Sequence, residues 1–502
     1  MSLKAEHQSV EGFLRNTLTA EARRNVLFVS FTQWDFALAA LADTASCLNN
    51  MGADVTLAFW ANKTPMHDTG WSVNDKVAKI FGSPARDQLV RDALIDFGIP
   101  KSSLAQPPVK GWKPAQPVII TRAMNRSEIK ALTYFGSPMG RAMLQVRTLT
   151  ETPVTDAYLW PERLLRLAAR SYAFAYDQTT ALIKERGVTA VAVYNGRFLH
   201  DRAASAAAQA LGIPVLYYDT GGIDTDFDLT DSVTHDWSDL QRRMLKLYEE
   251  WPADQRDVVG ASWFQERLNH TASDNSLFTD AQEIGSTIDR PDADCLVVYF
   301  SSSGDEIAEL ELDWDQFIGT QPEALKMLAD ECRKRPGYQL VVRSHPHKRR
   351  KPKQDVIEWI TAVDEANPDI HLDPHSPIDS YALMRQADIV VTYGSTTGVE
   401  AAFAGKRVIV LGPSAYDQLG CATLAGTPAE LSTALDDRNA GAWAGAVSYG
   451  LMMRARGFRF EFVKLSPDGA LALGGQTFGD SRPVVRHLSN IIARLQRWYL
   501  RK

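Results

Sequence analysis

The sequence predicts an α/β protein with two Rossmann-like, doubly wound domains. Strand-like apolar segments alternate with helical segments twice, first between about residues 25 and 218 and again between about residues 295 and 411. The strand-like segments are continuously apolar, which is typical of parallel strands covered on both faces. The chain has 502 residues, too many for one hydrophobic core but enough for two domains of roughly 200 residues each.

The first series opens with a βαβ unit. A strand over Asn25–Phe31 precedes a helix over Phe36–Asn50, and Gly52 is expected to cap that helix before a second strand over Asp54–Phe59. Residues 61–161 are less regular and rich in polar residues and proline, so we interpret them as helical and loop insertions beside a cleft. The series resumes with a helix, a strand, a helix and a strand over Leu164–Arg186, Ala190–Tyr194, Asp201–Leu211 and Pro214–Tyr218.

A polar stretch from Asp236 to Asp294 separates the two series. It has no strong strand pattern, so we place the domain junction between residues 270 and 292. The predicted domains are residues 1–285 and residues 286–480, followed by a C-terminal helix over residues 481–502. The strands of the second domain are predicted over Cys295–Phe300, Gln339–Arg343, Ile370–Leu372, Ile389–Thr392 and Val408–Leu411. Its helices are predicted over Glu323–Lys334, Asp355–Asn367, Ile378–Gln386 and Thr397–Ala404.

The last predicted helix is amphipathic. Between Val484 and Leu500, apolar residues recur at helical spacing with arginines between or beside them. We interpret this segment as a helix docked on the body of the protein. The alternative is a basic amphipathic face that makes a peripheral contact with anionic lipid at the inner membrane.

The composition excludes several classes of function. The formal net charge of −7 gives no overall attraction to nucleic acid, so an anionic ligand would need local basic groups. The four cysteines are scattered without metal-ligand spacing, which favours a reducing compartment and argues against structural zinc. The N-terminus lacks the apolar run of a secretory signal, and no later stretch approaches the length of a membrane span. We expect a cytoplasmic protein.

Polar residues follow the predicted strands of the second domain, where ligands of doubly wound sheets bind. The strand that ends at Arg343 is followed by Ser344, His345, Pro346 and His347. The imidazole of His345 can hydrogen-bond a phosphate oxygen, and the Arg343 guanidinium can add a bidentate contact. The alternative is a strand that merely ends in a polar turn.

A second motif follows the strand that ends at Thr392. Three hydroxyl residues, Ser395, Thr396 and Thr397, stand between Gly394 and Gly398 at the start of a predicted helix. The glycines allow a ligand to approach the backbone, and the hydroxyls and helix N–H groups can bind an anion. The alternative is an ordinary helix cap, but three hydroxyl residues between two glycines exceed what a cap requires.

Two residues further along are candidates for contacts with a nucleotide bound at this anion site. Glu400 lies little more than one helical turn beyond Ser395, where its carboxylate can accept hydrogen bonds from ribose hydroxyls. Tyr416 follows the next strand and is a candidate for the pocket of the nucleotide base. The alternatives are a solvated helix carboxylate and an ordinary turn.

A third loop follows the strand that ends at Phe300. Ser302 and Ser303 are expected to contact the donor phosphates, and Asp305 or Glu306 is a candidate base. Adjacent acidic residues are most often only solvated.

The first domain presents polar residues after its own strands. Asn195 and Arg197 follow one strand, Asp219 follows another, and Asp35 lies shortly after the first. We expect them on the acceptor side of the site. A transferase that inverts its anomeric centre needs a base for the acceptor hydroxyl, and the candidates are Asp35, Asp219, Asp305 and Glu306.

Taken together, the motifs resemble a known family. Arg-x-His-Pro at residues 343–346 is followed about fifty residues later by Gly-Ser-Thr-x-Gly-x-Glu-Ala and then by Gly-Lys-x-Val-Ile. This pattern resembles bacterial transferases of capsule and lipopolysaccharide biosynthesis, which have the GT-B fold of two Rossmann-like domains facing a central cleft. It is similar in particular to Kdo-transferase-like and sialyltransferase-like enzymes. The resemblance covers mainly residues 295–425, with weaker support from residues 190–222.

The resemblance implies a glycosyltransferase that moves a sugar from a nucleotide sugar to a glycan or glycolipid acceptor. It implies that His345, Ser395 and Thr396 contact the donor phosphate, and that neither a metal nor another cofactor is required. A CMP-linked acidic sugar is the first expected donor, with a UDP or GDP sugar next. One departure from the family pattern is Asp219, where a Glu is expected.

Three other functions compete with this interpretation. A sugar-nucleotide 2-epimerase has the same fold, but its Ser-Gly-Gly-x-x-Glu-Glu pattern is absent where this chain has Gly-Ser-Thr-Thr-Gly-Val-Glu. A polyol-phosphate transferase also pairs His-Pro with a Ser-Thr loop. The last alternative is a non-catalytic nucleotide-sugar-binding subunit of a polysaccharide assembly complex.

Overall fold

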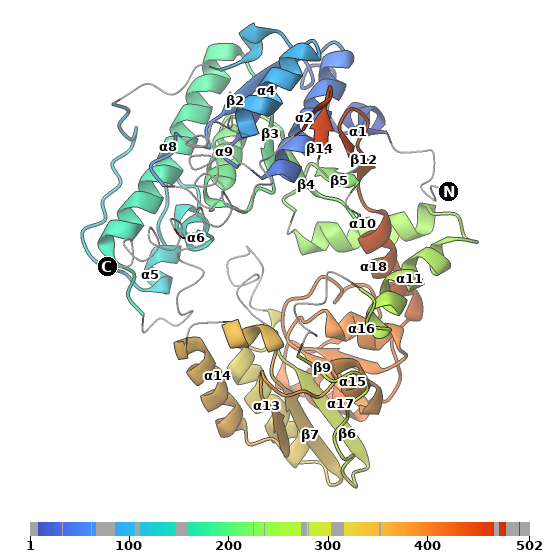
Figure 1. The fold of residues 1–502 in the computed structure, drawn as a ribbon. Coiled ribbons are helices and arrows are strands. Elements are labelled where there is room, and N and C mark those ends of the chain that lie inside the picture. The colour runs from blue at the N-terminus through green and yellow to red at the C-terminus, as the bar shows by residue number, and fades with distance from the viewer. Residues whose placement is uncertain are drawn as a thin grey trace. The chain divides into compact units, whose positions relative to one another are not determined.

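The chain folds into two compact units, seen in a computed structural model (Figure 1). The first unit comprises Met1–His235 and Arg456–Lys502, and the second comprises Asp236–Ala455. The structure describes residues 9–32, 34–61, 63–66, 86–105, 111–146, 158–223, 225–234, 236–272, 279, 281–302, 316–350, 353–465, 471–477 and 491. The predicted C-terminal helix therefore lies, apart from residue 491, outside the described residues.

The second unit begins about fifty residues before the predicted boundary at residue 285. Helices α10 (Trp237–Glu250) and α11 (Arg256–Leu268) both pack against α18 (Trp443–Ala455) of the same unit. Trp263 and Phe264 of α11 are buried in its core. The polar stretch before the predicted junction, which we assigned to the first domain, thus forms amphipathic helices of the second unit, and the boundary at residue 285 falls inside that unit.

The sheet of the first unit has the strand order β12-β5-β4-β3-β1-β2. The four predicted strands form its parallel part, as β1 (Asn25–Ser30), β2 (Asp54–Phe59), β3 (Ala190–Tyr194) and β4 (Val215–Thr220). Two antiparallel strands that we did not predict extend it, β5 (Asp226–Thr230) and β12 (Phe458–Arg459). The order 2-1-3-4 of the parallel strands places the switch point of the winding between β1 and β3.

Helices cover both faces of this sheet. Successive residues of β1 point to opposite faces, so Phe28 packs in one core and Val29 in another. Helices α1 (Val10–Thr17), α2 (Asp35–Asn50) and α4 (Arg86–Asp96) contribute to the first core, and α8 (Glu162–Arg186) and α9 (Leu199–Ala210) to the second. Gly52 has φ +81°, as expected of the predicted glycine after α2. Between α4 and α8, the described residues form the short helices α5 (Arg126–Lys130) and α6 (Met139–Leu144) and a 3₁₀ turn at Lys101–Ser103.

A buried carboxylate holds the C-terminal segment of the first unit, which begins at Arg456, against α2. Asp43 of α2 is fully buried and accepts hydrogen bonds from the backbone N–H groups of Glu461, Phe462 and Val463 at 2.7–3.2 Å. Burial raises the pKa of Asp43, and the three N–H donors oppose that shift. A small antiparallel sheet of β13 (Lys464–Leu465), β14 (Leu471–Leu473) and β15 (Gln476–Thr477) follows, with β14 against α2.

The sheet of the second unit is parallel throughout and has the order β11-β10-β9-β6-β7-β8. Its strands are β6 (Cys295–Phe300), β7 (Tyr338–Arg343), β8 (Ile370–Leu372), β9 (Ile389–Thr392), β10 (Arg407–Val410) and β11 (Thr423–Leu424). Counted within the unit, this is the order 3-2-1-4-5-6 of a Rossmann fold. The switch point therefore lies between β6 and β9, the two strands paired at the centre of the sheet.

The alternating side chains of β6 divide the second unit into two cores. Val298 points toward α10, α11, α15 (Ser380–Gln386), α16 (Thr397–Phe403) and α18, whereas Val297 points toward α13 (Gln321–Arg333), α14 (Lys353–Ala366) and α17 (Pro428–Asp436). Helices therefore cover both faces of this sheet too. The α/β class and the two Rossmann-like domains are confirmed. The cleft between them stays a prediction.

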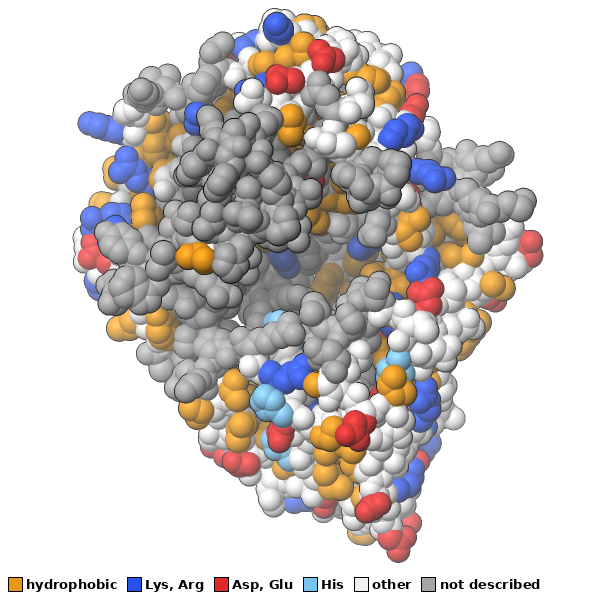
Figure 2. Space-filling model, viewed as in Figure 1, with side chains coloured by type: hydrophobic (Ala, Val, Ile, Leu, Met, Phe, Trp, Pro, Cys, Tyr) orange, Lys and Arg blue, Asp and Glu red, His pale blue; other side chains and the backbone are white. Residues whose placement is uncertain are grey.

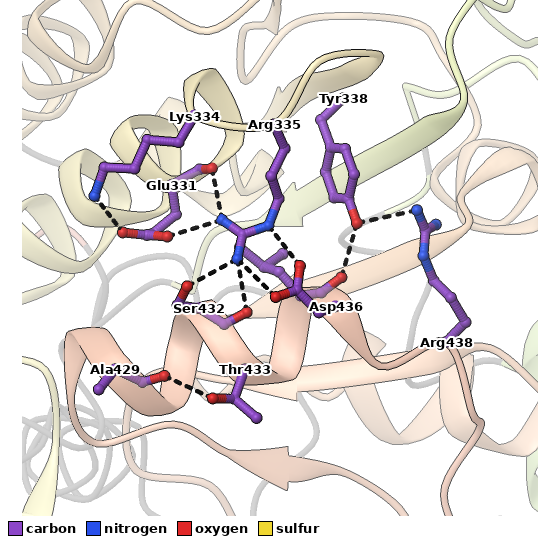
Figure 3. Close-up of polar contacts among 10 residues, drawn as sticks. Glu331, Lys334, Arg335, Tyr338, Ala429, Ser432, Thr433, Asp436 and Arg438 are labelled. Atoms are coloured by element: carbon purple, nitrogen blue, oxygen red, sulfur yellow. Dashed lines mark hydrogen bonds and ion pairs between the residues drawn. The ribbon is translucent and has the colours of Figure 1, made fainter.

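A polar network joins the end of α13 to α17 (Figure 3). Arg335 donates to the Glu331 and Asp436 carboxylates at 2.8 Å and to the carbonyl and hydroxyl of Ser432, also at 2.8 Å. Hydrogen bonds from Lys334 and Arg335 lower the pKa of Glu331 to about 2. Because these contacts satisfy the whole guanidinium fork, they fix the two helices on one face of the sheet.

All four cysteines are buried and carry free thiols. A search of the described residues finds no helix with both the length and the apolar character needed to cross a membrane.

Candidate functional site

The candidate site of the second unit lies at the carboxyl ends of its central strands. The loops after β6, β7 and β9 leave the sheet on both sides of the switch point. Open α/β sheets bind their ligands at such a point, because the two loops there diverge and leave room between them. The predicted His345 and Ser395–Thr397 belong to these loops.

The loop after β7 is tied to the end of β6 through Ser301. The Ser301 N–H donates to the Arg343 carbonyl at 3.1 Å, and the Ser301 hydroxyl accepts from the His345 N–H at 2.8 Å. The His347 N–H donates to Nδ1 of His345 at 3.1 Å, so the proton of a neutral His345 ring belongs on Nε2. The imidazole is half-buried. This arrangement gives His345 a defined orientation with a donor nitrogen, which suits an anionic ligand.

Arg343 has a different role from the predicted phosphate contact. Its side chain is only 2% exposed, and its guanidinium donates to the carbonyls of Asp373 at 2.8 Å and Ser376 at 3.1 Å. Burial lowers the pKa of Arg343 to about 10. A buried guanidinium that already holds the loop after β8 cannot also grip a ligand at the surface. The predicted contact of Arg343 is therefore corrected to a supporting one.

Ser344, the residue before His345, is held by side chains of α14 and β8. Trp359 of α14 donates through Nε1 to the Ser344 hydroxyl at 2.7 Å, and His371 Nε2 lies 2.9 Å from the same oxygen. Ser344 is fully buried, and burial lowers the pKa of His371. Sequence reasoning missed Ser301, Trp359 and His371, since nothing in their spacing indicates that they meet at one loop.

The Ser-Thr loop after β9 presents its hydroxyls at the surface. Thr396 is exposed, and Ser395 and Thr397 are half-buried. The Ser395 hydroxyl lies 3.3 Å from that of Thr397 and accepts a hydrogen bond from the Thr397 N–H at 3.4 Å. Gly394 has φ +83°, and a Cβ there would lie 1.9 Å from the Pro413 carbonyl oxygen. A side chain at position 394 would thus clash with the backbone at Pro413, so glycine is required there. The three hydroxyl residues lie together in the loop that follows.

Tyr416 supports this loop from below and does not line a base pocket. Its side chain is 1% exposed, and its hydroxyl donates to the Ser395 carbonyl at 2.6 Å and lies 3.0 Å from the Thr392 hydroxyl. A Cβ on Gly398 would stand 2.1 Å from that phenolic oxygen. Gly398 therefore makes room for Tyr416. These contacts correct the predicted ligand contacts of both residues.

Glu400 also points into the protein. It is 5% exposed; its Oε1 lies 3.6 Å from Nε of Arg267 and 3.3 Å from the hydroxyl of Tyr381. Arg267 in turn lies over the ring of Trp263, 3.5 Å from its centroid. The predicted contact with ribose is corrected to a buried ion pair that joins α11 to α16.

The loop after β6 is described only at its start. Ser302 is 8% exposed, and its N–H donates at 2.8 Å to the side chain of Gln321, the first residue of α13. The predicted contacts of Ser303, Asp305 and Glu306 lie outside the described residues.

The first unit has a polar pair at the ends of β3 and β4. Asn195 is 4% exposed, has φ +55°, and donates through Nδ2 to the carboxylate of Asp219. The Thr220 N–H donates to the same carboxylate at 2.7 Å. Burial raises the pKa of Asp219, and the two hydrogen bonds oppose that shift. A non-glycine residue in the left-handed region beside the switch point is a common mark of a functional position.

Arg197 and Asp35 flank the same edge of the first sheet. The Arg197 N–H donates to the Asn195 side-chain oxygen at 3.3 Å, and its guanidinium lies 5.3 Å from the centroid of the Phe198 ring. Asp35 is the first residue of α2, after β1, and is half-buried. The predicted acceptor-side residues therefore gather at the β1–β3 switch point of their own unit. Within the described residues, no group of three or more His, Cys, Asp or Glu could hold a metal ion.

Comparison with known proteins gives a family match over the second unit. A sequence model of the family described as "Capsule polysaccharide biosynthesis protein" matches residues 313–443. This segment contains His345, the Ser-Thr loop and Tyr416, and it is about a quarter of the chain. No curated protein sequence matches the chain.

Several solved structures are similar to the chain at low identity. Two are Kdo transferase domains of Thermosulfurimonas dismutans KpsC. The β-Kdo 2,7-transferase is 16% identical to this chain, with a TM-score of 0.35; the similarity covers 63% of this chain and 90% of the transferase. The β-Kdo 2,4-transferase is 14% identical, with a TM-score of 0.32; the similarity covers 60% of this chain and 88% of the transferase. A UDP-GlcNAc 2-epimerase of Methanocaldococcus jannaschii, in complex with UDP-GlcNAc and UDP, has 10% identity, 85% and 97% coverage, and a TM-score of 0.28.

Proposed function

We propose that this protein is a glycosyltransferase of bacterial surface-polysaccharide synthesis, of the GT-B type, and that its second unit binds the nucleotide-sugar donor. One observation carries the proposal. On one side of the switch point, the His345 N–H donates a hydrogen bond to the Ser301 hydroxyl at 2.8 Å, which holds the loop after β7. On the other side, the loop after β9 exposes Thr396. The capsule-family match spans both loops.

The two loops suit the phosphate of a departing nucleotide. The Nε2–H of His345 and the hydroxyls of Ser395 and Thr396 can donate to phosphate oxygens, and the hydrogen bonds beneath them hold these donors in place. Preorganised donors stabilise the charge that develops as the glycosidic bond breaks, because they need little reorientation during the reaction. In this mechanism neither a metal nor another cofactor takes part.

The proton of the acceptor hydroxyl goes to a carboxylate of the first unit in this proposal. Asp219 is the favoured base, because burial raises its pKa and Asn195 fixes its orientation. Asp35 is the second candidate. Asn195 and Arg197 would orient the acceptor beside them. We propose a glycan or glycolipid acceptor and a cytoplasmic location at the inner membrane, where such acceptors are extended.

The donor is expected to be a CMP-linked acidic sugar, with a UDP or GDP sugar as the alternative. The test is a thermal unfolding series with CMP, CDP, UDP, GDP and NAD, because a ligand that binds only the folded protein raises the melting temperature. We expect one nucleotide to raise the transition of the second unit and the others to leave it unchanged. The same series with Thr396→Val tests whether the loop after β9 makes the contact. No shift with any nucleotide would contradict the proposal.

Product analysis separates the competing reactions. Incubation of the protein with its preferred nucleotide sugar alone should release little free nucleotide, whereas addition of an acceptor should release it in proportion to glycoside formed. Formation of an epimerised sugar in the absence of an acceptor, either still linked to the nucleotide or released from it, would show a 2-epimerase. Binding without turnover under any condition would show a non-catalytic subunit.

A further inference from the structure

The tight turn between α5 and α6 presents an aromatic ring to solvent. Tyr134 and Ser137 form an antiparallel bridge, with backbone N–H···O hydrogen bonds of 3.0 Å in both directions. The two residues between them, Phe135 and Gly136, have φ +47° and +77°, as in a type I′ turn. Phe135 is 53% exposed. The turn therefore places a phenyl ring at its tip, on the surface of the first unit.

Phenylalanine is an unfavourable residue at this place in a turn. Both central positions of a type I′ turn need a left-handed backbone, which Gly, Asn and Asp adopt readily and a bulky residue does not. An exposed ring also forgoes the burial through which Phe usually stabilises a fold. Neither the turn geometry nor the core accounts for Phe135. Non-glycine residues in this region of the backbone are common at functional positions, so the ring points to a ligand.

The neighbouring side chains hold the ring in one orientation. Phe135 stacks on Tyr176 of α8, with ring centroids 5.6 Å apart and an interplanar angle of 15°. Tyr134 meets the same ring edge to face at 4.9 Å, and its hydroxyl donates to the Asp177 carboxylate of α8 at 2.9 Å. Figure 1 shows α6, which follows the turn, beside α8. Because Tyr176 occupies one face of the Phe135 ring, the exposed area lies on the other face and the edge.

A planar polar side chain stands beside this ring. Oε1 of Gln116 accepts a hydrogen bond from the Phe135 N–H at 2.9 Å, and the Gln116 N–H donates to the Tyr134 hydroxyl at 3.2 Å. Gln116 is exposed, and Nε2 of its fixed amide can donate to a ligand over the ring. The C–H groups on one face of a pyranose pack well on the negative face of an aromatic ring, and its hydroxyls accept hydrogen bonds at the rim. The pair of groups therefore suits a sugar.

We propose that Phe135 is a stacking platform for one pyranose ring of the acceptor glycan. The inference rests on the proposed function and deepens it, because it names a contact for the acceptor. Leu199 packs in the same buried cluster as Tyr134 and Tyr176, beneath the platform. It is the first residue of α9, which begins four residues after Asn195. The platform and the proposed base thus belong to one compact unit, on which a chain of several sugars can contact both.

A protein partner fits this surface less well. A stable protein interface buries about 800 Å² on each partner. Phe135 and the exposed Ile119 and Leu159 of the same unit together offer roughly 300 Å², which is ordinary for the surface of a monomer. On the face that Figure 2 draws, apolar side chains form small groups separated by polar ones. One aromatic ring matches a single sugar ring in size.

The test measures glycan binding to the full-length protein without nucleotide, by isothermal titration calorimetry. The probes are maltohexaose, cellohexaose and chitohexaose, and sorbitol is the control that keeps the hydroxyls and lacks a ring. We expect binding of at least one hexasaccharide and no binding of sorbitol. Phe135→Leu keeps an apolar side chain but loses the flat face, so it should weaken that binding by about two- to tenfold. Phe135→Trp offers a larger face and should retain it.

Stability separates a ligand platform from a structural residue. Phe135→Asn introduces a residue that tolerates the left-handed backbone, and this gain offsets the lost stacking on Tyr176. Its melting temperature should therefore stay within about 4 °C of the wild type, while hexasaccharide binding falls as in Phe135→Leu. Leu211→Asn is the matched control, because it removes an exposed apolar side chain at the end of α9 in the same unit. It should leave binding unchanged.

Four outcomes would overturn the inference. They are no binding of any hexasaccharide, equal binding of sorbitol, unchanged binding by Phe135→Leu and Phe135→Asn, and equal weakening by Leu211→Asn. A large fall in the melting temperature of Phe135→Asn would show that the ring is structural and would also reject it.

The nucleotide series distinguishes this inference from the proposed function. A protein that binds a nucleotide but no hexasaccharide keeps the proposed function and loses the platform. A protein that binds a hexasaccharide through Phe135 but no nucleotide loses the proposed function. Each result is read from its own ligand, so the two failures cannot be confused.

Discussion

The switch points of the two sheets share a geometry and differ in chemistry. In the second unit, the loops carry an imidazole and three hydroxyls, and buried groups such as Ser301 and Tyr416 hold them from below. In the first unit, a buried carboxylate, Asp219, is paired with the amide of Asn195. The first set consists of donors suited to an anion, and the second can accept a proton. The same architecture therefore supports two complementary chemical tasks, because the loops change while the strands do not.

The comparison also separates the residues that would face the proposed ligand from residues that support them. His345 and Thr396 are accessible, whereas Arg343, Glu400 and Tyr416 are all at most 5% exposed. Substitution of an accessible residue should change activity at constant stability. Substitution of one of these three buried residues should change stability first. The predictions below for His345 and Tyr416 test this division.

The largest effect is expected from the proposed base. Asp219→Asn should lower turnover by about 10²- to 10⁴-fold, because the amide cannot take the acceptor proton. Nucleotide affinity should be unchanged, since Asp219 belongs to the other unit. The measurement is steady-state turnover beside nucleotide titration, with the exposed Asp231→Asn as control. If Asp35→Asn abolishes turnover while Asp219→Asn does not, the role of base passes to Asp35.

His345→Ala should lower turnover by about 10²-fold or more, through loss of one donor to the departing phosphate. The exposed His375→Ala, in the same unit, is the matched control and should retain full turnover. Single-turnover kinetics at saturating donor isolates the chemical step. Near-normal turnover of His345→Ala would remove this residue from the mechanism.

Tyr416→Phe tests the support beneath the Ser-Thr loop. Loss of the hydroxyl leaves the Ser395 carbonyl without this partner, which should cost about 1–3 kcal/mol of stability and also weaken nucleotide binding. Tyr393→Phe provides a close comparison, because the Tyr393 hydroxyl donates at 2.6 Å to the Gly319 carbonyl. It should lose similar stability but keep nucleotide affinity. Equal loss of affinity in both variants would argue that Tyr416 has no specific connection to the donor site.

The smallest effect concerns the network of α13 and α17, which lies outside both switch points. The pKa of Glu331 is lowered from 4.5 to about 2, so the folded state favours its charged form. The resulting stabilisation is complete above the unfolded pKa of 4.5 and is lost as the pH falls toward 2. Glu331→Gln should therefore melt below the wild type at pH 7, and the difference should shrink between about pH 4.5 and 2. A difference independent of pH would contradict the assigned pKa.

Local patterns in the sequence predicted the framework of both sheets. Continuous apolar runs gave Cys295–Phe300 and Ala190–Tyr194 with the bounds that the structure shows, because strands buried on both faces have this signature. The short β5 carries alternating aspartates, and two-residue strands such as β12 have no local pattern, so neither was predicted. The amphipathic α10 and α11 were not recognised as helices of the second unit and were assigned to the first domain, because their polar faces dominate the composition.

The sequence by itself determined the α/β class, the two doubly wound series, and the strand ends at which His345, Asp219 and the Ser-Thr motif lie. These properties follow from local periodicity and from the rule that ligands meet the carboxyl ends of parallel strands. Only the tertiary structure decided which polar residues support those loops. The ion pair of Glu400 with Arg267 joins residues from distant elements, and so does the hydrogen bond from the Phe462 N–H to Asp43. No local pattern encodes such contacts, because they exist only once the helices have packed.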